Sequence, residues 1–134
     1  MPIADFNFLA VLACGVAAFV LGGLWYSPIM FGKRWMALSG VSEEQARSGN
    51  PWRLFGGAFV LALIGAVVFA MFLGPRPALP MAVGAGFMAG FFWVAGSLGI
   101  NYLFERKPLG LWLINGGYHT LQYTVYGLIL GLWK

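Results

Sequence analysis

The chain has 134 residues, of which 60% are hydrophobic and only 9% are charged. An ordinary soluble domain carries about 25% charged residues, and a chain of this length cannot hide so much apolar surface from water. The composition therefore argues against a water-soluble domain, and an unusually apolar soluble bundle is the alternative to a membrane protein.

The charged residues are clustered, and long uncharged stretches separate the clusters. Four stretches without Asp, Glu, Lys or Arg hold 27, 22, 28 and 26 residues. Because a helix crosses the bilayer core in about 20 residues, each stretch fits one span. The predicted spans are Phe6–Tyr26, Leu54–Leu73, Met81–Leu103 and Leu111–Trp133. We therefore predict an all-α, integral membrane bundle of four transmembrane helices, with residues 1–134 as a single domain.

The first span ends in the segment LWYSPIMFGKRW, residues 24–35. A residue before proline avoids the helical conformation, so the span should end at Tyr26. Ser27 could then cap a new helix with Pro28 at its first position. Residues 29–38 suit a short helix lying in the membrane interface. The aromatic residues expected at the membrane boundary are Trp25, Tyr26 and Trp35.

The first span lacks a basic leading region and is too long for a signal peptide, so we expect it to be retained. Its Cys14 is the only cysteine, which excludes an intrachain disulfide. Further along, residues 42–45 (SEEQ) resemble a capping box, and residues 48–51 (SGNP) should end that turn. Residues 74–80 (GPRPALP) predict a tight loop on the other side.

The basic residues are distributed unevenly between the two sides. Six of the eight lie in the loops after spans one and three, namely Lys33, Arg34, Arg47, Arg53, Arg106 and Lys107. An excess of Lys and Arg marks the cytoplasmic side. We therefore expect a multi-pass protein of the bacterial inner membrane with both termini outside the cytoplasm. The basic residues would face lipid headgroups, so no nucleic-acid partner is expected.

Small residues in the last two spans predict close helix packing. Gly86 and Gly90 form one GxxxG pair, and Gly127 and Gly131 form another. Close backbone approach stabilises helix pairs in lipid. The pairs fit packing within the bundle and packing between copies equally well, and a homo-oligomer is one hypothesis.

The last span carries a stripe of polar residues. Asn115, His119, Gln122 and Tyr126 fall at i, i+4, i+7 and i+11, which places them on one helix face. Unpaired polar groups are costly in hydrocarbon, so this face should point inward or toward a partner. Since span three runs antiparallel, equal depth would place Asn101 near Asn115 and Ser97 near His119.

Three roles are open for His119, the only histidine and the only group in a span that titrates near neutral pH. It could be a neutral ring that locks two helices together, part of a pathway for a proton or small solute, or a cofactor ligand. No cluster of Cys, Asp and Glu accompanies it, which disfavours a metal site, and the spans contain no acidic residue to orient the ring in a catalytic triad. We therefore expect no enzyme activity, no metal and no cofactor.

Two segments, LGGLWYSPIMFGKRW and NYLFERKPLGLWLINGGYH, resemble a known bacterial and fungal membrane family, the domain of unknown function 1761. The resemblance implies a four-helix membrane protein and names no activity. Its motifs concentrate at the predicted cytoplasmic ends of the helices, so any site should lie there. The residues at that end are Trp25, Tyr26, Ser27, Pro28, Lys33, Tyr102 and Glu105. Ser27, Asn101, Tyr102 and Asn115 would then face one another at one membrane level.

The functional hypotheses belong to different classes. The first is a homo-oligomeric membrane protein that binds or passes a small solute, ion or proton through the polar stripe. The second is a structural or accessory membrane subunit whose stripe only holds helices together. The third, a membrane enzyme or cofactor carrier, is disfavoured because the spans contain no acidic residue.

Overall fold

The computed structural model describes residues 6–133, and within this range the chain is helical and has no strand. The elements in chain order are α1 (Phe8–Trp25), α2 (Gly32–Ser39), α3 (Glu43–Arg47), α4 (Pro51–Leu73), α5 (Leu79–Met88), the π-helix η2 (Ala89–Ala95), α6 (Gly96–Glu105) and α7 (Leu109–Leu132). The long helices begin and end within a few residues of the four predicted spans, because charges, prolines and glycines end them where the sequence indicates.

Three helices are long and apolar enough to cross a membrane. They are α1, α4 and the continuous helix Leu79–Glu105, with mean hydropathies of 2.3, 2.5 and 1.6 over their most apolar windows. Helix α7 has 24 residues but is not among them, because its polar residues lower its hydropathy. It nevertheless buries residues along its whole length, from Leu111 to Gly131. Its neighbours include α1, α5 and η2, so protein covers much of its surface.

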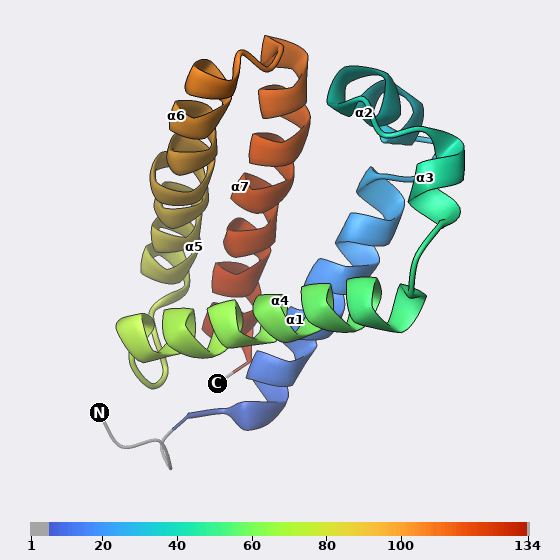
Figure 1. The fold of residues 1–134 in the computed structure, drawn as a ribbon. Coiled ribbons are helices and arrows are strands. Elements are labelled where there is room, and N and C mark those ends of the chain that lie inside the picture. Colours follow the sequence, from blue (N-terminus) through green and yellow to red (C-terminus); the bar gives the residue numbers. More distant parts are fainter. Residues whose placement is uncertain (1–5, 134) are drawn as a thin grey trace.

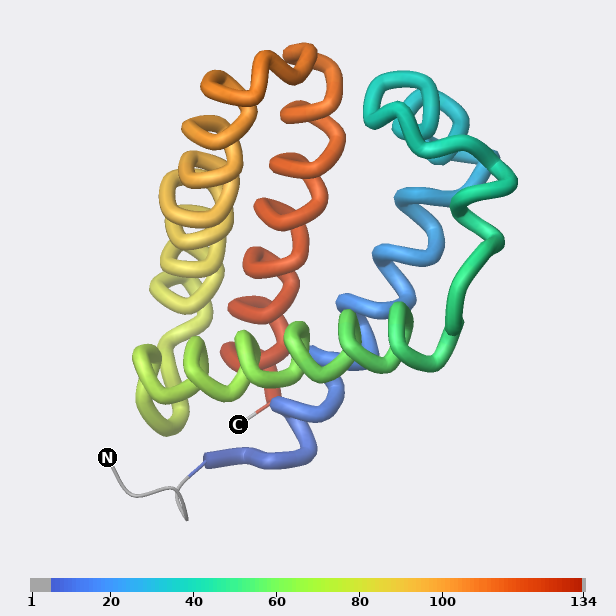
Figure 2. Tube along the Cα trace, in the orientation of Figure 1, coloured from blue at the N-terminus to red at the C-terminus, as the bar shows by residue number. Residues whose placement is uncertain are grey.

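The helices are arranged around α7, as Figure 1 shows. The continuous helix α5–η2–α6 runs antiparallel beside α7, and α1 lies on its other side, while α4 lies across α1 at a steep inclination to α7. The tube in Figure 2 shows that the start of α1, the end of α7 and the α4–α5 loop share one end of the molecule. We call this the terminal end, where Asn7 Nδ2 donates to the carbonyl oxygen of Trp133 at 3.0 Å. Helix α2 and the α6–α7 loop lie at the opposite end, which we call the motif end.

Glycines bring α5 and η2 into backbone contact with α7. A Cβ atom on Gly90 would lie 2.7 Å from the carbonyl oxygen of His119, and one on Gly131 would lie 3.0 Å from Leu79 Cα. Cβ atoms on Gly86 and Gly127 would meet the carbonyl groups of Tyr123 and Ala82. Both GxxxG pairs therefore pack against each other's helices inside the chain.

The π-helix η2 changes which residues of this long helix face α7. The buried positions are Ala82, Gly86, Gly90 and Ala95, so the spacing is four residues twice and then five. A π turn closes its hydrogen bonds from i to i+5 and holds one more residue than an α turn. Beyond η2, the face toward α7 is consequently one residue later than an uninterrupted α-helix would place it.

The connection after α1 differs from the expected one. A turn occupies residues 26–31, and α2 begins at Gly32 rather than near residue 29. Ser27 does not cap it, because its hydroxyl donates to the carbonyl oxygen of Leu24 at 2.6 Å. The backbone N–H of Phe31 reaches back to the carbonyl oxygen of Trp25 at 3.0 Å and closes the turn.

Of the two helix starts after this turn, the first has the predicted chemistry and the second differs from the prediction. Ser42 and Gln45 form the predicted capping box at the start of α3, with bonds of 3.1 and 2.9 Å between side chains and backbone N–H groups. Helix α4 begins earlier than expected, at Pro51, because Asn50 Oδ1 accepts the N–H of Trp52 at 2.9 Å. A side-chain cap and a first-turn proline both favour a helix start.

Candidate functional site

Three segments far apart in the sequence meet at Asn115 at the motif end. The Tyr26 hydroxyl donates to Asn115 Oδ1 at 2.7 Å, and Asn115 Nδ2 donates to the Tyr102 hydroxyl oxygen at 2.8 Å. One residue earlier on each side, Trp25 Nε1 donates to the carbonyl oxygen of Ile114 at 2.9 Å. The Asn115 amide therefore links α7 both to the end of α1 and to α6.

Tyr118 completes this group from the next turn of α7. Its ring lies 5.6 Å from that of Tyr26, centroid to centroid, and its hydroxyl donates to the carbonyl oxygen of Ala18 at 2.8 Å. The side chains of Tyr26, Tyr102, Asn115 and Tyr118 are all half-buried. We call these four residues the aromatic–amide cluster.

The turn after α1 holds Tyr26 in place. The ring of Trp25 lies 4.8 Å from that of Phe31, and the ring of Tyr26 lies 5.9 Å from that of Trp35 in α2. Gly32 is required at the start of α2, because a Cβ atom there would lie 2.8 Å from the Ser27 carbonyl oxygen. The aromatic residues and the glycine of this segment thus fold α2 back over the end of α1.

Two residues predicted to face α7 do not reach it. Asn101 is exposed, and Tyr102 contacts Asn115 in its place. Ser97 is also exposed, and His119 bonds to Gln122 instead. The expected pairings of Asn101 with Asn115 and of Ser97 with His119 are wrong, because η2 shifts the contact face of the helix by one residue.

The remaining motif residues lie outside the aromatic–amide cluster. Pro28, Lys33 and Glu105 are exposed, and Ser27 bonds only within its own turn. Within residues 6–133 one ion pair forms, between Arg47 and Glu43. The charged motif residues are therefore placed to meet solvent or lipid headgroups rather than one another.

The deeper part of the polar stripe forms a linear chain of hydrogen bonds. His119 Nδ1 lies 2.7 Å from Gln122 Oε1, Gln122 Nε2 donates to the Tyr126 hydroxyl oxygen at 2.8 Å, and that hydroxyl donates to the carbonyl oxygen of Ala62 in α4 at 2.8 Å. We call it the buried chain. Because an amide oxygen only accepts, the imidazole carries a proton on Nδ1. Gln122 is 5% exposed and Tyr126 is 0% exposed, so these two residues are closed to solvent, whereas His119 is half-buried.

The sequence reasoning missed the carbonyl groups that accept these side chains. Trp112 Nε1 donates to the carbonyl oxygen of Ala95 at 2.7 Å, in the last turn of η2. A buried indole N–H needs an acceptor, so Trp112 was a signal for such a contact. The acceptor itself could not be found, because only the packing of two helices brings that carbonyl within reach.

Two cavities lie away from the aromatic–amide cluster. One is an open pocket on α3, lined by Glu43, Glu44, Arg47 and Ser48, and the other, of about 250 Å³, lies at the terminal end, where Asn7 and Trp133 meet. Across residues 6–133 no group of three or more His, Cys, Asp or Glu side chains could hold a metal ion. The aromatic–amide cluster is thus a half-exposed polar patch, and it is the place where the motif segments converge.

These features define an all-helical protein with three helices apolar enough to span a membrane, and with a polar face on the helix between them. The family described as Protein of unknown function (DUF1761) matches residues 9–131, and the chain belongs to this family. The match includes the aromatic–amide cluster and the buried chain. No curated protein and no solved structure matches the chain.

Proposed function

We propose that the protein is a four-span protein of the bacterial inner membrane that binds a small hydrogen-bonding solute at the aromatic–amide cluster. The observation that carries the proposal is the convergence of three motif segments on Asn115. The hydroxyl groups of Tyr26 and Tyr102 and the Asn115 amide offer donors and acceptors side by side, with part of their surface open. Such a group suits a neutral amide or polyol better than an ion, because it contains no charged side chain.

The fourth crossing is supported by the packing of α7. A short loop joins it to α6, and it runs antiparallel along α5–η2–α6 (Figure 1). A helix paired along its length with a spanning helix must cross with it. Its polar face is tolerated because other helices cover it.

The orientation follows from the basic residues. Lys33, Arg34, Arg106 and Lys107 belong to α2 and to the α6–α7 loop at the motif end. An excess of basic residues favours the cytoplasmic side, so we infer that the motif end is cytoplasmic. Single cysteines in place of Arg76 and Lys107, in a Cys14→Ala background, test this orientation in intact cells. An impermeant maleimide should label position 76 alone, and labelling at position 107 alone would reverse the orientation.

The buried chain argues for binding rather than passage. Its hydrogen bonds run in one direction and end on the carbonyl oxygen of Ala62. A backbone carbonyl has no proton to pass on, so a proton relay through Tyr126 stops there. In proteoliposomes we expect proton and glycerol fluxes equal to those of protein-free vesicles.

Ligand stabilisation tests the binding role. A bound solute raises the unfolding midpoint by mass action, so acetamide and glycerol should raise it for the wild type. The Asn115→Ala variant should lose this increase. Asn101→Ala is the matched control, because Asn101 is an exposed asparagine at a similar level, and it should keep the increase. An equal response of both variants, or no increase for the wild type, would contradict a site at Asn115.

A structural subunit is the second candidate, and one observation favours it. Within residues 6–133 every buried side-chain nitrogen and oxygen has a hydrogen-bond partner. In this alternative the polar stripe only joins helices, and a homo-oligomer or partner subunit supplies the activity. His119→Phe separates the two, because it spares the cluster. The structural role would be favoured by two results together. The His119→Phe variant would unfold in detergent, and the unfolding midpoint of the wild type would not rise with acetamide or glycerol.

A further inference from the structure

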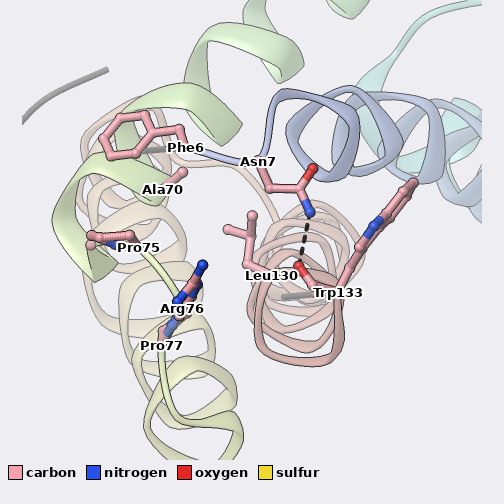
Figure 3. A pocket seen from close by; sticks show the side chains of 9 residues that line it. Phe6, Asn7, Ala70, Pro75, Arg76, Pro77, Leu130 and Trp133 are labelled. Atoms are coloured by element: carbon pink, nitrogen blue, oxygen red, sulfur yellow. Dashed lines mark hydrogen bonds between the residues drawn. The ribbon is translucent and has the colours of Figure 1, made fainter. Parts of the chain in front are cut away.

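The cavity at the terminal end lies where α1, the α4–α5 loop and α7 come together, as Figure 3 shows. Its volume is about 250 Å³, and it is open on one side. The residues that matter for its chemistry are Phe6, Ala70 and Leu130 on the apolar walls and Asn7, Arg76 and Trp133 on the rim. The lining mixes polar and apolar groups, and the charged Arg76 among them distinguishes this cavity from the aromatic–amide cluster at the motif end.

The rim is fixed by two hydrogen bonds of the Asn7 amide. Its Nδ2 donates to the Trp133 carbonyl oxygen at 3.0 Å, and its Oδ1 accepts the N–H of Ala10 at 3.0 Å. The first turn of α1 is therefore tied to the end of α7. Of the three rim residues, Arg76 alone is left with charged donors to offer.

The backbone of Arg76 is held in an uncommon conformation. Its φ angle is 51°, in the left-handed region that residues other than glycine rarely adopt. Pro75 and Pro77 flank it and restrict the loop further. Figure 3 shows the side chain beside the cavity between these prolines and Leu130. The loop therefore presents a guanidinium group at the cavity.

No carboxylate of residues 6–133 neutralises this guanidinium. The acidic residues in that range are Glu43, Glu44 and Glu105, and the one ion pair formed there joins Glu43 to Arg47. Guanidinium groups bind phosphate oxygens through paired hydrogen bonds. Arg76 thus brings to the rim donors of the kind that bind an anion.

The surface near the cavity and its position in the membrane favour a lipid over bare phosphate. Phe6, Ala70 and Leu130 are only 8%, 5% and 7% exposed, so the apolar area that an acyl chain can cover must come from exposed side chains nearby. The exposed side chains of Phe72 (76%) and Leu132 (64%) continue the apolar surface at the adjoining ends of α4 and α7. Helix ends in a membrane lie at the level of the headgroups.

We propose that this cavity binds an anionic phospholipid, with the headgroup phosphate on Arg76 and the top of an acyl chain along the exposed side chains of Phe72 and Leu132. A zwitterionic choline lipid fits less well, because the cavity lining within residues 6–133 contains no acidic side chain that could bind its ammonium group. The proposal rests on the placement of the helices in a membrane, and it is independent of the solute site proposed at the motif end.

Site-resolved cross-linking tests the proposal in bilayers of phosphatidylcholine with one quarter phosphatidylglycerol. A photoactivatable phosphatidylglycerol is incorporated in trace amount, and the labelled peptides are mapped by mass spectrometry. We expect labelling around residues 70–77 and 130–133. Arg76→Gln should lower it about tenfold, the loss expected when one charge-assisted contact is removed. Arg76→Lys should retain part of it.

Arg106→Gln is the matched control. Arg106 also lies in a short loop between two long helices, with a φ angle of 58°, and it does not line the cavity. It should leave the labelling at residues 70–77 unchanged. Arg76→Gly should fold at least as well as the wild type, since glycine adopts a positive φ freely, and it should also lose the label.

Four outcomes would overturn the proposal. They are absence of the wild-type label, equal labelling of the Arg76→Gln variant, an equal decrease in the Arg106→Gln variant, and equal labelling by a matched phosphatidylcholine probe. Inorganic phosphate at about 10 mM is concentrated enough to fill a simple ion site. If it displaced the lipid label, the cavity would be a site for a free anion and not for a phospholipid. Solute binding at the motif end should be the same in all of these variants. A failure of the proposed solute site would therefore be distinguishable from a failure of the proposed lipid site.

Discussion

Two faces of α7 pack by different physics. One face meets α5 and η2 through Gly127, Gly131 and Gly90, with backbone against backbone. The other face meets α1 and α4 through hydrogen bonds from tyrosine and amide side chains. We call them the glycine face and the polar face of α7.

The difference teaches what each contact requires of the sequence. The glycine face depends on the absence of a side chain, so any added atom must displace a helix. The polar face depends on paired donors and acceptors, so a change there leaves a group without its partner. Shape should therefore dominate stability at the first face, whereas single hydrogen bonds of about 0.5–2 kcal/mol should dominate at the second.

The glycine face should give the largest effect. Gly86→Leu places a side chain where the Tyr123 carbonyl group lies, and we expect a loss of about 3 kcal/mol in the free energy of unfolding. Unfolding by SDS in bicelles, followed by circular dichroism, measures this loss. Gly84→Leu is the control two residues away, because a Cβ atom there meets nothing within 4 Å. Equal loss in both variants would mean that leucine itself, rather than the close contact, is responsible.

The buried part of the polar face should come next. Tyr126→Phe leaves the Gln122 amide and the Ala62 carbonyl group without their partner, which should lower the free energy of unfolding by about 1–2 kcal/mol. The same SDS titration measures it. Tyr123→Phe is the matched control, because the Tyr123 hydroxyl makes no hydrogen bond to any of residues 6–133. A loss in Tyr123→Phe as large as that in Tyr126→Phe would refute the assigned role of the buried chain.

The half-exposed part of the polar face should respond less. Asn115→Ala removes the bonds to Tyr26 and Tyr102, and we expect a loss of about 0.5–1 kcal/mol, since lipid headgroups or water can replace part of them. Asn101→Ala should leave the free energy of unfolding unchanged. If Asn101→Ala were the more harmful change, the contact face would follow an uninterrupted α-helix after all.

The smallest effect should come from removing the extra residue of η2. Deletion of Phe92, which is 60% exposed, turns the five-residue step between Gly90 and Ala95 into an α-helical step of four. The residues that face α7 then stay the same, so the unfolding midpoint should change by no more than about 1 °C. Deletion of Ile100, which is 59% exposed, should instead separate Tyr102 from Asn115. A much larger loss for the Phe92 deletion than for the Ile100 deletion would contradict this account of the register.

Sequence patterns sufficed where one local rule decided the outcome. The uncharged stretches placed the long helices, and the SEEQ segment fixed the capping box of Ser42 and Gln45. The segment after α1 was predicted less well, because the closure of the turn between Trp25 and Phe31 depends on backbone bonds that leave no pattern in the residues. Ser27 followed by Pro28 fits a helix start, but the turn uses the Ser27 hydroxyl instead.

The candidate site was half predictable for the same reason. The period of α7 alone placed Asn115, His119, Gln122 and Tyr126 on one face, because a regular helix repeats every 3.6 residues. The partner residues on the neighbouring helix could not be read in this way. Ser97 and Asn101 follow the regular repeat, but η2 adds a residue to one turn and brings Tyr102 to the contact.

The sequence by itself determined that this chain is helical, where its long helices begin and end, and which side of α7 is polar. Those properties depend on composition and on the fixed repeat of a single helix. The tertiary structure decided which GxxxG pairs meet, which carbonyl groups accept the buried tyrosines, and that Arg76 lies at the mouth of a cavity. These contacts depend on how the helices are rotated and inclined relative to one another. A small local departure such as a π turn changes that rotation, and the sequence of a single segment does not determine it.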